Sequence, residues 1–172
     1  EFDLASFGEA VIPKGIFEAG EIKDESSLIK IIRQAISEVK GEKLKTNEVV
    51  CSLSEEKSFL RVMQLPKMDP EELEKAICFE AENHIPIPLQ EACLGYEVIE
   101  PLVDHLDHCD ILVAAAPRKI IDGYARVLRA VGLAPVSFET ESLSISRALV
   151  NNWLTVNPIL LIDLGATKTT LM

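Results

Sequence analysis

Residues 65–88, LPKMDPEELEKAICFEAENHIPIP, predict a helix with a marked beginning and a marked end. Asp69 is a good N-cap, Pro70 suits the first helical position, and Glu72 stands where a capping box places a carboxylate. Pro86 ends the helix, because proline lacks a backbone N–H and disfavours helical geometry in the residue before it. Any fold for this chain must therefore include a separate helix here, followed by an extended segment.

One face of this helix is apolar at the 3.6-residue period, through Leu73, Ala76, Ile77, Ala81 and Ile85. Glu80 and His84 lie in the middle of that face, where an acid and a base need a partner or a wet groove. One interpretation is a polar pair that lines a peptide groove, and the other, which we favour, is a structural hydrogen bond or a boundary position at the domain edge. Phe79 falls outside the apolar face, where an exposed aromatic side chain can mark a partner contact.

The residues of this stretch also resemble a known family. A Leu-Pro pair, an acidic helix with Phe-Glu-Ala-Glu and the Ile-Pro-Ile-Pro-Leu run look like the PilM family of type IV pilus assembly proteins. Those proteins are relatives of the cell-division protein FtsA among the actin-like ATPases. Residues 126–149 also resemble the family's segment of helix, Gly-Leu, strand, acidic turn and second helix. The resemblance covers nearly the whole chain.

Alternating and apolar runs predict an α/β fold. The predicted strands cover 4–12, 16–22, 47–53, 58–65, 93–100, 109–116, 134–138 and 159–163, with a new strand from Thr169, and the remaining helices cover 24–39, 117–131 and 141–154. Asp24 or Ser26 caps the first helix, and 159–163 is expected to be buried. The resemblance implies a partial actin-like (RNase H-like) domain at 1–56 and 139–172, interrupted by an SHS2-type β-α-β-β-α-β domain at 57–138.

Charge and cysteine content exclude several classes of function. The net charge is -11 and no basic block occurs, which argues against a nucleic-acid surface and against electrostatic binding to anionic lipid. No apolar run is long enough for a transmembrane helix. The four cysteines lack the C-x-x-C spacing of a zinc or redox site, so we expect reduced, buried thiols in the cytosol.

The strongest candidate site follows the apolar run ILLI. A strand that ends in Asp163, turns at Gly165 and returns through Thr169 suits a phosphate hairpin, because glycine permits close backbone approach. The hydroxyls of Thr167 and Thr169 can face phosphate, Asp163 can hold water on magnesium, and Lys168 adds charge or points to solvent. The segment looks like the second phosphate loop of actin-like ATPases, Asp-x-Gly-x-x-x-Thr. The alternative is an ordinary hairpin with glycine at its turn.

A second polar cluster suggests a metal site only weakly. It contains Asp104, His105, Asp107, His108, Cys109 and Asp110. Its spacing fits no recognised zinc pattern, so we interpret it as a polar connector that enters a strand. The sequence contains neither a Ser-His-Asp set nor a P-loop, and we predict no catalytic residue and no metal site.

The resemblance implies a cytoplasmic protein of the pilus assembly machine, peripheral at the inner membrane through its partners. It implies that the full-length protein binds ATP and magnesium and docks the cytoplasmic N-terminal tail of a PilN-type membrane protein. Its docking groove involves the inserted domain, and hydrolysis of ATP stays open. Three alternatives are an FtsA-like division protein, a GspL-like type II secretion protein and, as an enzyme, a sugar kinase of the same superfamily.

The ends of the sequence lead us to expect a piece of a longer protein. It opens with Glu1-Phe2 and stops within a predicted strand at Thr170–Met172. In actin-like proteins a first phosphate hairpin and an adenosine pocket complete the nucleotide site, and here they would lie outside residues 1–172. We therefore expect these 172 residues to bind no ATP by themselves.

Overall fold

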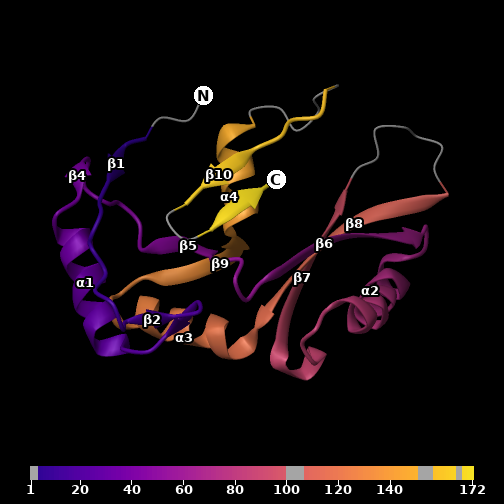
Figure 1. Cartoon of the computed structure of the whole chain (residues 1–172), viewed down its shortest axis with the longest axis horizontal. Helices are drawn as coiled ribbons and strands as arrows, with labels where there is room; N and C mark the ends of the chain where they lie inside the picture. The colour runs from indigo at the N-terminus through magenta and orange to yellow at the C-terminus, as the bar shows by residue number, and fades with distance from the viewer. Residues whose placement is uncertain (1–3, 100–106, 151–156, 166–167) are drawn as a thin grey trace. The chain divides into compact units, whose positions relative to one another are not determined.

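The structure, a computed structural model, describes residues 4–99, 107–150, 157–165 and 168–172 and has the predicted mixed α/β architecture (Figure 1). The chain divides into two compact units, the first of Glu1–Cys51 and Arg118–Phe138, the second of Ser52–Pro117 and Glu139–Met172. Within the described ranges, no helix has both the length and the apolar composition that a membrane span requires.

The first unit is built on two helices, α1 (Glu25–Ser37) and α3 (Arg118–Ala130), which contact each other. Its strands pair in twos: β1 (Ser6–Phe7) with β4 (Lys40–Gly41), β2 (Phe17–Glu18) with β3 (Glu21–Ile22), and β5 (Glu48–Leu53) with β9 (Ala134–Thr140). Leu28 of α1 and Val127 of α3 are buried together with Ile16. At the surface, Arg126 and Glu25 join the two helices through an ion pair of 2.8 Å.

Two strand predictions in this unit are wrong in extent. The strand predicted over 4–12 is confined to β1, and Val11 is exposed, because β1 pairs only with the two residues of β4 among the described residues. The strand predicted over 16–22 is instead the β2–β3 hairpin. Its turn residues Ala19 and Gly20 have φ of 46° and 76°, and two consecutive left-handed residues produce the tight turn typical of such hairpins.

The start of α1 follows the prediction closely. The Asp24 carboxylate accepts hydrogen bonds from the Ser27 backbone N–H at 3.0 Å and from the Ser26 hydroxyl at 2.8 Å. These bonds, with Ser27 contributing most, lower the pKa of Asp24 from its ordinary value of 3.8 to about 2. Asp24 is therefore the N-cap.

The second unit contains an antiparallel sheet in the order β6-β8-β7. Its elements are β6 (Phe59–Pro66), α2 (Pro70–His84), the short 3₁₀ helix η1 (Leu89–Glu91), β7 (Ala92–Ile99), β8 (His108–Pro117), α4 (Glu141–Leu149), β10 (Ile162–Leu164) and β11 (Thr169–Leu171). The strand-helix-strand-strand order predicted over 58–116 is confirmed. The helix predicted over 141–154 is described as α4 up to Leu149, and its predicted last residues, 151–154, lie outside the described residues.

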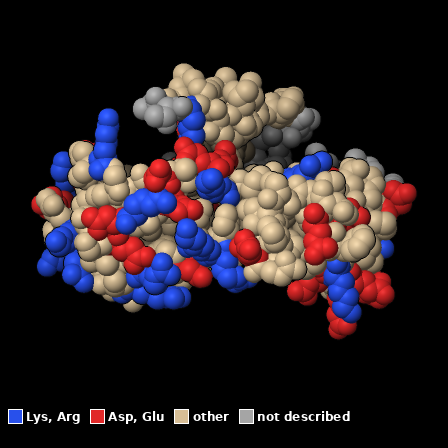
Figure 2. Space-filling view, turned by 60° about the horizontal axis from the view of Figure 1, so that its bottom comes forward, with Lys and Arg blue, Asp and Glu red and all other residues tan. Residues whose placement is uncertain are grey.

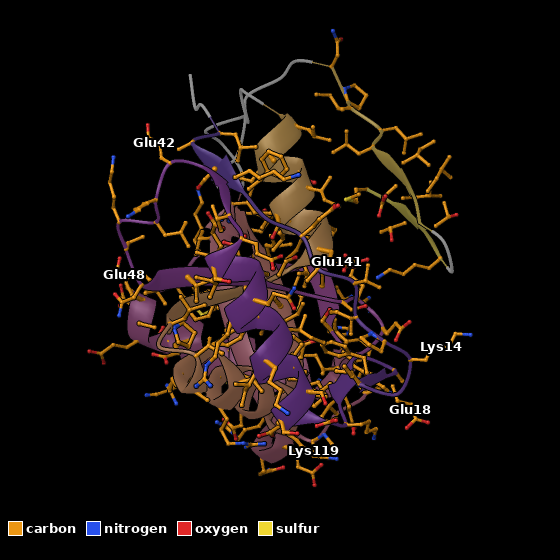
Figure 3. All side chains as sticks on the ribbon, turned by 90° about the vertical axis from the view of Figure 1, so that its left-hand side faces the viewer. Lys14, Glu18, Glu42, Glu48, Lys119 and Glu141 are labelled. Carbon is orange, nitrogen blue, oxygen red and sulfur yellow. The ribbon has the colours of Figure 1, made fainter. Side chains whose placement is uncertain are left out.

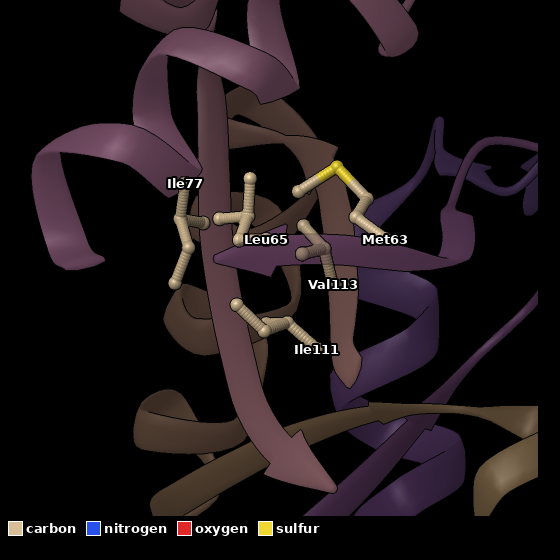
Figure 4. Packing of buried hydrophobic residues seen from close by; sticks show 5 residues of the cluster. All are labelled: Met63, Leu65, Ile77, Ile111 and Val113. Carbon is tan, nitrogen blue, oxygen red and sulfur yellow. The ribbon is translucent and has the colours of Figure 1, made fainter. Parts of the chain in front are cut away.

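Helix α2 lies against one face of this sheet, and Ile77 at its centre has no exposed surface. Its side chain belongs to a cluster with Met63 and Leu65 of β6 and Ile111 and Val113 of β8 (Figure 4). The predicted apolar face of the helix is confirmed, since Leu73, Ala76 and Ile85 pack on this cluster and Ala81 is buried.

The beginning of α2 is where predicted, but its capping differs. The Asp69 side chain makes no capping hydrogen bond. Instead its backbone carbonyl accepts the N–H groups of Glu72 and Leu73 at 3.0 and 2.9 Å. The capping box expected from Asp69 and Glu72 is therefore wrong, and Pro70 and the chain geometry start the helix.

The burial predicted for 159–163 is also wrong. Ile159, Leu160 and Ile162 are 48%, 69% and 55% exposed. In the part of the chain that the structure describes, β10 pairs with β11 alone, and a two-stranded ribbon leaves one face without cover. The strand predicted from Thr169 is confirmed as β11.

We predict that Ile77→Ala will lower the free energy of unfolding by about 2–5 kcal/mol, because a buried aliphatic side chain is removed and a cavity remains. The control is Phe79→Ala on the same helix, whose side chain is 67% exposed, and it should change stability by about 0.5 kcal/mol or less. Urea unfolding followed by circular dichroism measures both, and equal losses would contradict the described packing of α2.

We predict that the Asp24 carboxyl titrates near pH 2 in the folded protein. Because its folded pKa lies below its ordinary value, the stability it gives α1 is complete above pH 3.8 and is lost as the pH falls through about 2. An NMR titration of the side-chain carboxyl measures this. Ser26→Ala should raise the pKa, and Ser37→Ala, at the other end of α1, should leave it unchanged; a wild-type midpoint near 3.8 would refute the cap.

Candidate functional site

The predicted phosphate hairpin forms at β10 and β11. The two strands are antiparallel, and Asp163 is opposite Thr170 while Leu164 is opposite Thr169. Side chains alternate between the faces of a strand, and directly opposed residues share a face. Asp163 and Thr170 therefore share the half-buried face, and Thr169 lies on the exposed face with Leu164.

The turn of the hairpin depends on Gly165. Its N–H donates to the Lys168 carbonyl at 3.0 Å, and a Cβ built on Gly165 would lie 3.0 Å from that same oxygen. A side chain at this position would push against the Lys168 carbonyl, which would have to move by a few tenths of an ångström. Thr167, the other hydroxyl of the prediction, lies outside the described residues.

Lys168 is directed to neighbouring segments of its own unit. Its Nζ donates to Glu141 Oε2 at 2.5 Å and to Ser54 Oγ at 3.0 Å in the loop after β5. Glu141 is the first residue of α4 and is labelled in Figure 3. The hydrogen bond to Glu141 raises the pKa of Lys168, and the carboxylates of Glu141, Glu55 and Glu56 add to the increase. The ammonium group stays charged at neutral pH, and its side chain is one-third exposed.

The same loop also holds the start of α4. Glu55 Oε1 accepts the backbone N–H of Ser142 at 3.2 Å, and Thr140, the residue at the N-cap, makes no side-chain cap bond. A carboxylate at this position satisfies a free N–H group and lies favourably at the positive end of the helix dipole. Loop, helix and hairpin turn thus meet through Glu55, Glu141 and Lys168.

A cavity of about 450 Å³ lies beside this meeting point. Its lining combines apolar side chains with hydroxyl groups and one carboxylate, and includes Glu55, Phe59, Leu60, Ser142, Leu143 and Ser146. Leu171, the last residue of β11, and Met172 after it also line the cavity. Such a lining can accept an apolar side chain and hydrogen-bond a peptide backbone at the rim.

Glu80 and His84 do not border this cavity. Their side-chain N and O atoms lie 3.8 Å apart, one turn apart on α2, and both side chains are more than one-third exposed. This partly exposed pair agrees with the favoured interpretation, a structural contact at a boundary position. Phe79 is exposed, as predicted.

The structure tests the metal interpretation of the polar cluster at 104–110 and the expectation of reduced, buried cysteines. Asp104 and His105 lie outside the described residues, and within the described ranges no group of three or more His, Cys, Asp or Glu could hold a metal ion. None of the four cysteines is in a disulfide bond. Cys78 is exposed, so the expectation of buried thiols is wrong there, while burial raises the pKa of the Cys51 thiol.

The surface carries mixed charges. In Figure 2, Lys and Arg side chains are interspersed with Asp and Glu on the visible face, and no broad area is basic alone. This distribution agrees with the absence of a basic block in the sequence.

Sequence reasoning missed two partners of Lys168. Ser54 is 114 residues from Lys168 and Glu141 is 27 residues away, so no local pattern joins them. Ser54 precedes Glu55 and Glu56, and Glu141 lies between Thr140 and Ser142. The sequence left open whether Lys168 adds charge to the turn or points to solvent.

Comparison with known proteins identifies related chains. The model of the family described as type IV pilus assembly protein PilM matches residues 1–172. A chain in a solved PilM–PilN type IV pilus biogenesis complex is 31% identical, with a TM-score of 0.68 over 78% of this chain and 40% of that chain. The cytoplasmic domain of EpsL, from the type II secretion system of Vibrio cholerae, is 15% identical with a TM-score of 0.45, over 64% and 42%. The chain thus spans less than half the length of either solved chain.

We predict that Gly165→Ala will loosen the hairpin, because the new Cβ meets the Lys168 carbonyl oxygen. Backbone amide exchange over 162–171 should become faster and the unfolding temperature should fall. The matched control is Gly95→Ala in β7, where a Cβ meets nothing within 4 Å. Equal exchange rates in wild type and Gly165→Ala would contradict the described turn.

Proposed function

Because the chain belongs to the family of type IV pilus assembly protein PilM, we propose that it is an actin-like adaptor of pilus assembly that docks the tail of a PilN-type protein. The observation that carries this proposal is the match to a chain of the PilM–PilN complex, at 31% identity and a TM-score of 0.68. The adaptor acts at the cytoplasmic side of the inner membrane and is held there by its partners.

The arrangement of the second unit supports an inserted domain in this adaptor. The order β6, α2, β7, β8 is the one expected for the SHS2-type domain that we assign to 57–138, within an actin-like domain at 1–56 and 139–172. We propose this division for its function: the small domain contributes Phe59 and Leu60 to the cavity beside the hairpin, and the actin-like domain holds nucleotide. The compact units divide the chain differently, with α3 in the first unit beside α1.

The hairpin residues fit one side of a nucleotide phosphate site in the full-length protein. Glycine at the turn allows close backbone approach, Lys168 brings a positive charge, and the half-buried Asp163 is suited to hold a water molecule on magnesium. Thr169 lies on the opposite face from Asp163, so we assign it no phosphate contact. ATP, when bound, supplies a magnesium-bound polyphosphate that these residues recognise.

The tail is proposed to bind in the cavity beside the hairpin. Phe59, Leu60 and Leu143 offer an apolar floor, and Ser146 offers a hydroxyl group at the rim. Peptides that dock in grooves bury apolar anchors and satisfy their backbone at the edges. Glu55 and the net charge of -11 favour a tail with positive charge near its anchor.

We predict that Ser146→Trp, which fills the cavity, will weaken binding of a PilN-type tail about tenfold or more, an effect of about 1.4 kcal/mol or more. The matched control is Ala148→Trp, which places the same side chain at an exposed position of α4 that does not line the cavity. Fluorescence anisotropy with a labelled tail peptide, and a scrambled peptide as reference, measures the affinity.

Two outcomes count against the proposal. If wild type binds the tail no better than the scrambled peptide, the adaptor function is wrong. If the tail binds and both tryptophan variants retain wild-type affinity, the cavity is not its site, and an unpaired edge of the β6-β8-β7 sheet becomes the better candidate.

A further inference from the structure

We propose that Glu141 competes with nucleotide phosphate for Lys168, so that the Glu141–Lys168 pair forms without nucleotide and opens when a polyphosphate binds. This inference rests on the phosphate role proposed for the β10–β11 hairpin. It concerns a residue that no phosphate motif contains, since Glu141 is the first residue of α4, 27 residues before the lysine.

The contacts show that Lys168 is already occupied. Its ammonium group donates to Glu141 at 2.5 Å and to Ser54 at 3.0 Å, and the side chain crosses from the hairpin turn to both of these segments. A phosphate group at the turn would offer oxygens to the same ammonium group. Lys168 has three N–H donors, but a bound polyphosphate and Glu141 would repel each other across it.

The local charge strengthens this competition. Glu55, Glu56 and Glu141 all act on the one ammonium group. A polyphosphate that approaches the turn therefore meets three carboxylates and one cation. Removing the charge of Glu141 lowers the repulsion and frees Lys168, whereas removing the charge of Lys168 leaves the carboxylates without their counter-ion.

The pair is also weak enough to open. The side chains of Lys168 and Glu141 are 33% and 38% exposed, and ion pairs in contact with water contribute little to stability. Ammonium groups make charge-assisted hydrogen bonds to carboxylate and to phosphate alike. A polyphosphate carries more negative charge than the single carboxylate of Glu141, so it attracts the ammonium group of Lys168 more strongly.

Opening the Glu141–Lys168 pair would change the contacts of residues beside the cavity. Ser54 and Glu55 lie in the loop that leads into β6, and Glu55 both caps α4 and lines the cavity. Once Lys168 leaves, the carboxylate of Glu141 and the hydroxyl of Ser54 lose their shared donor. Binding of phosphate at the hairpin would thus alter the proposed tail site through Ser54, Glu55 and Glu141.

Opposite changes in ATP affinity in two variants would distinguish competition from an ion pair that only stabilises the fold. Glu141→Gln and Lys168→Gln break the same ion pair, so a structural tie alone would move both variants in the same direction. Competition instead predicts that Glu141→Gln binds ATP about threefold more tightly and Lys168→Gln about tenfold more weakly. Both should lower the unfolding temperature without nucleotide, and Lys168→Gln should lower it more, because it leaves three carboxylates without their counter-ion.

The experiment measures magnesium-ATP affinity by calorimetry and thermal unfolding without nucleotide, in the full-length protein that contains this chain. The matched control is Glu139→Gln, which removes an acid paired with Arg147 two residues before Glu141 and should leave ATP affinity within about twofold of wild type.

Affinity shifts of opposite sign, with an unchanged control, support the competition. Shifts of the same sign, or none in either variant, overturn it while the phosphate role of the hairpin stands. If wild-type full-length protein binds no ATP, the phosphate role and the competition are both wrong, and tail binding, measured separately, still tests the adaptor function.

Discussion

The register between β6 and β8 determines which side chains of the second unit are buried. Met63 faces Ile111 and Leu65 faces Cys109 across the pair, and both lie on the side that α2 covers. A shift of one residue would turn Val62 and Gln64 toward α2 in their place. Ile77 fits the side chains of one register only, so the helix and the sheet each stabilise the position of the other.

The β10–β11 hairpin is held to its unit more by charged contacts than by burial of apolar side chains. Its outer face carries exposed Ile162 and Leu164, and its turn carries one cation among several carboxylates. The hydrogen bonds of Lys168 bind this ribbon to α4 and to the loop after β5.

The sequence predicted the helices and strands better than their burial and their tertiary contacts. The helix at 70–84 has an apolar period, a proline at its start and prolines after its end, all of which act locally. Burial of 159–163 could not be predicted, because an apolar run is the same whether or not another layer covers it. The separation of Asp163 from Thr169 depends on the register of the hairpin, which the motif spacing alone does not give. The partners of Lys168 are distant in sequence and join only in the folded chain.

The long separation within this network has a consequence for synthesis. Ser54 leaves the ribosome 114 residues before Lys168, which corresponds to roughly 6–23 seconds at about 5–20 residues per second. During that interval Glu55 and Glu56 are present without the lysine that later lies near them, and Glu141 joins them for the last 27 residues. The β6-β8-β7 sheet, whose strands end at residue 117, can form in that time. All strands of the hydrophobic layer are therefore synthesised before the lysine of the charged junction.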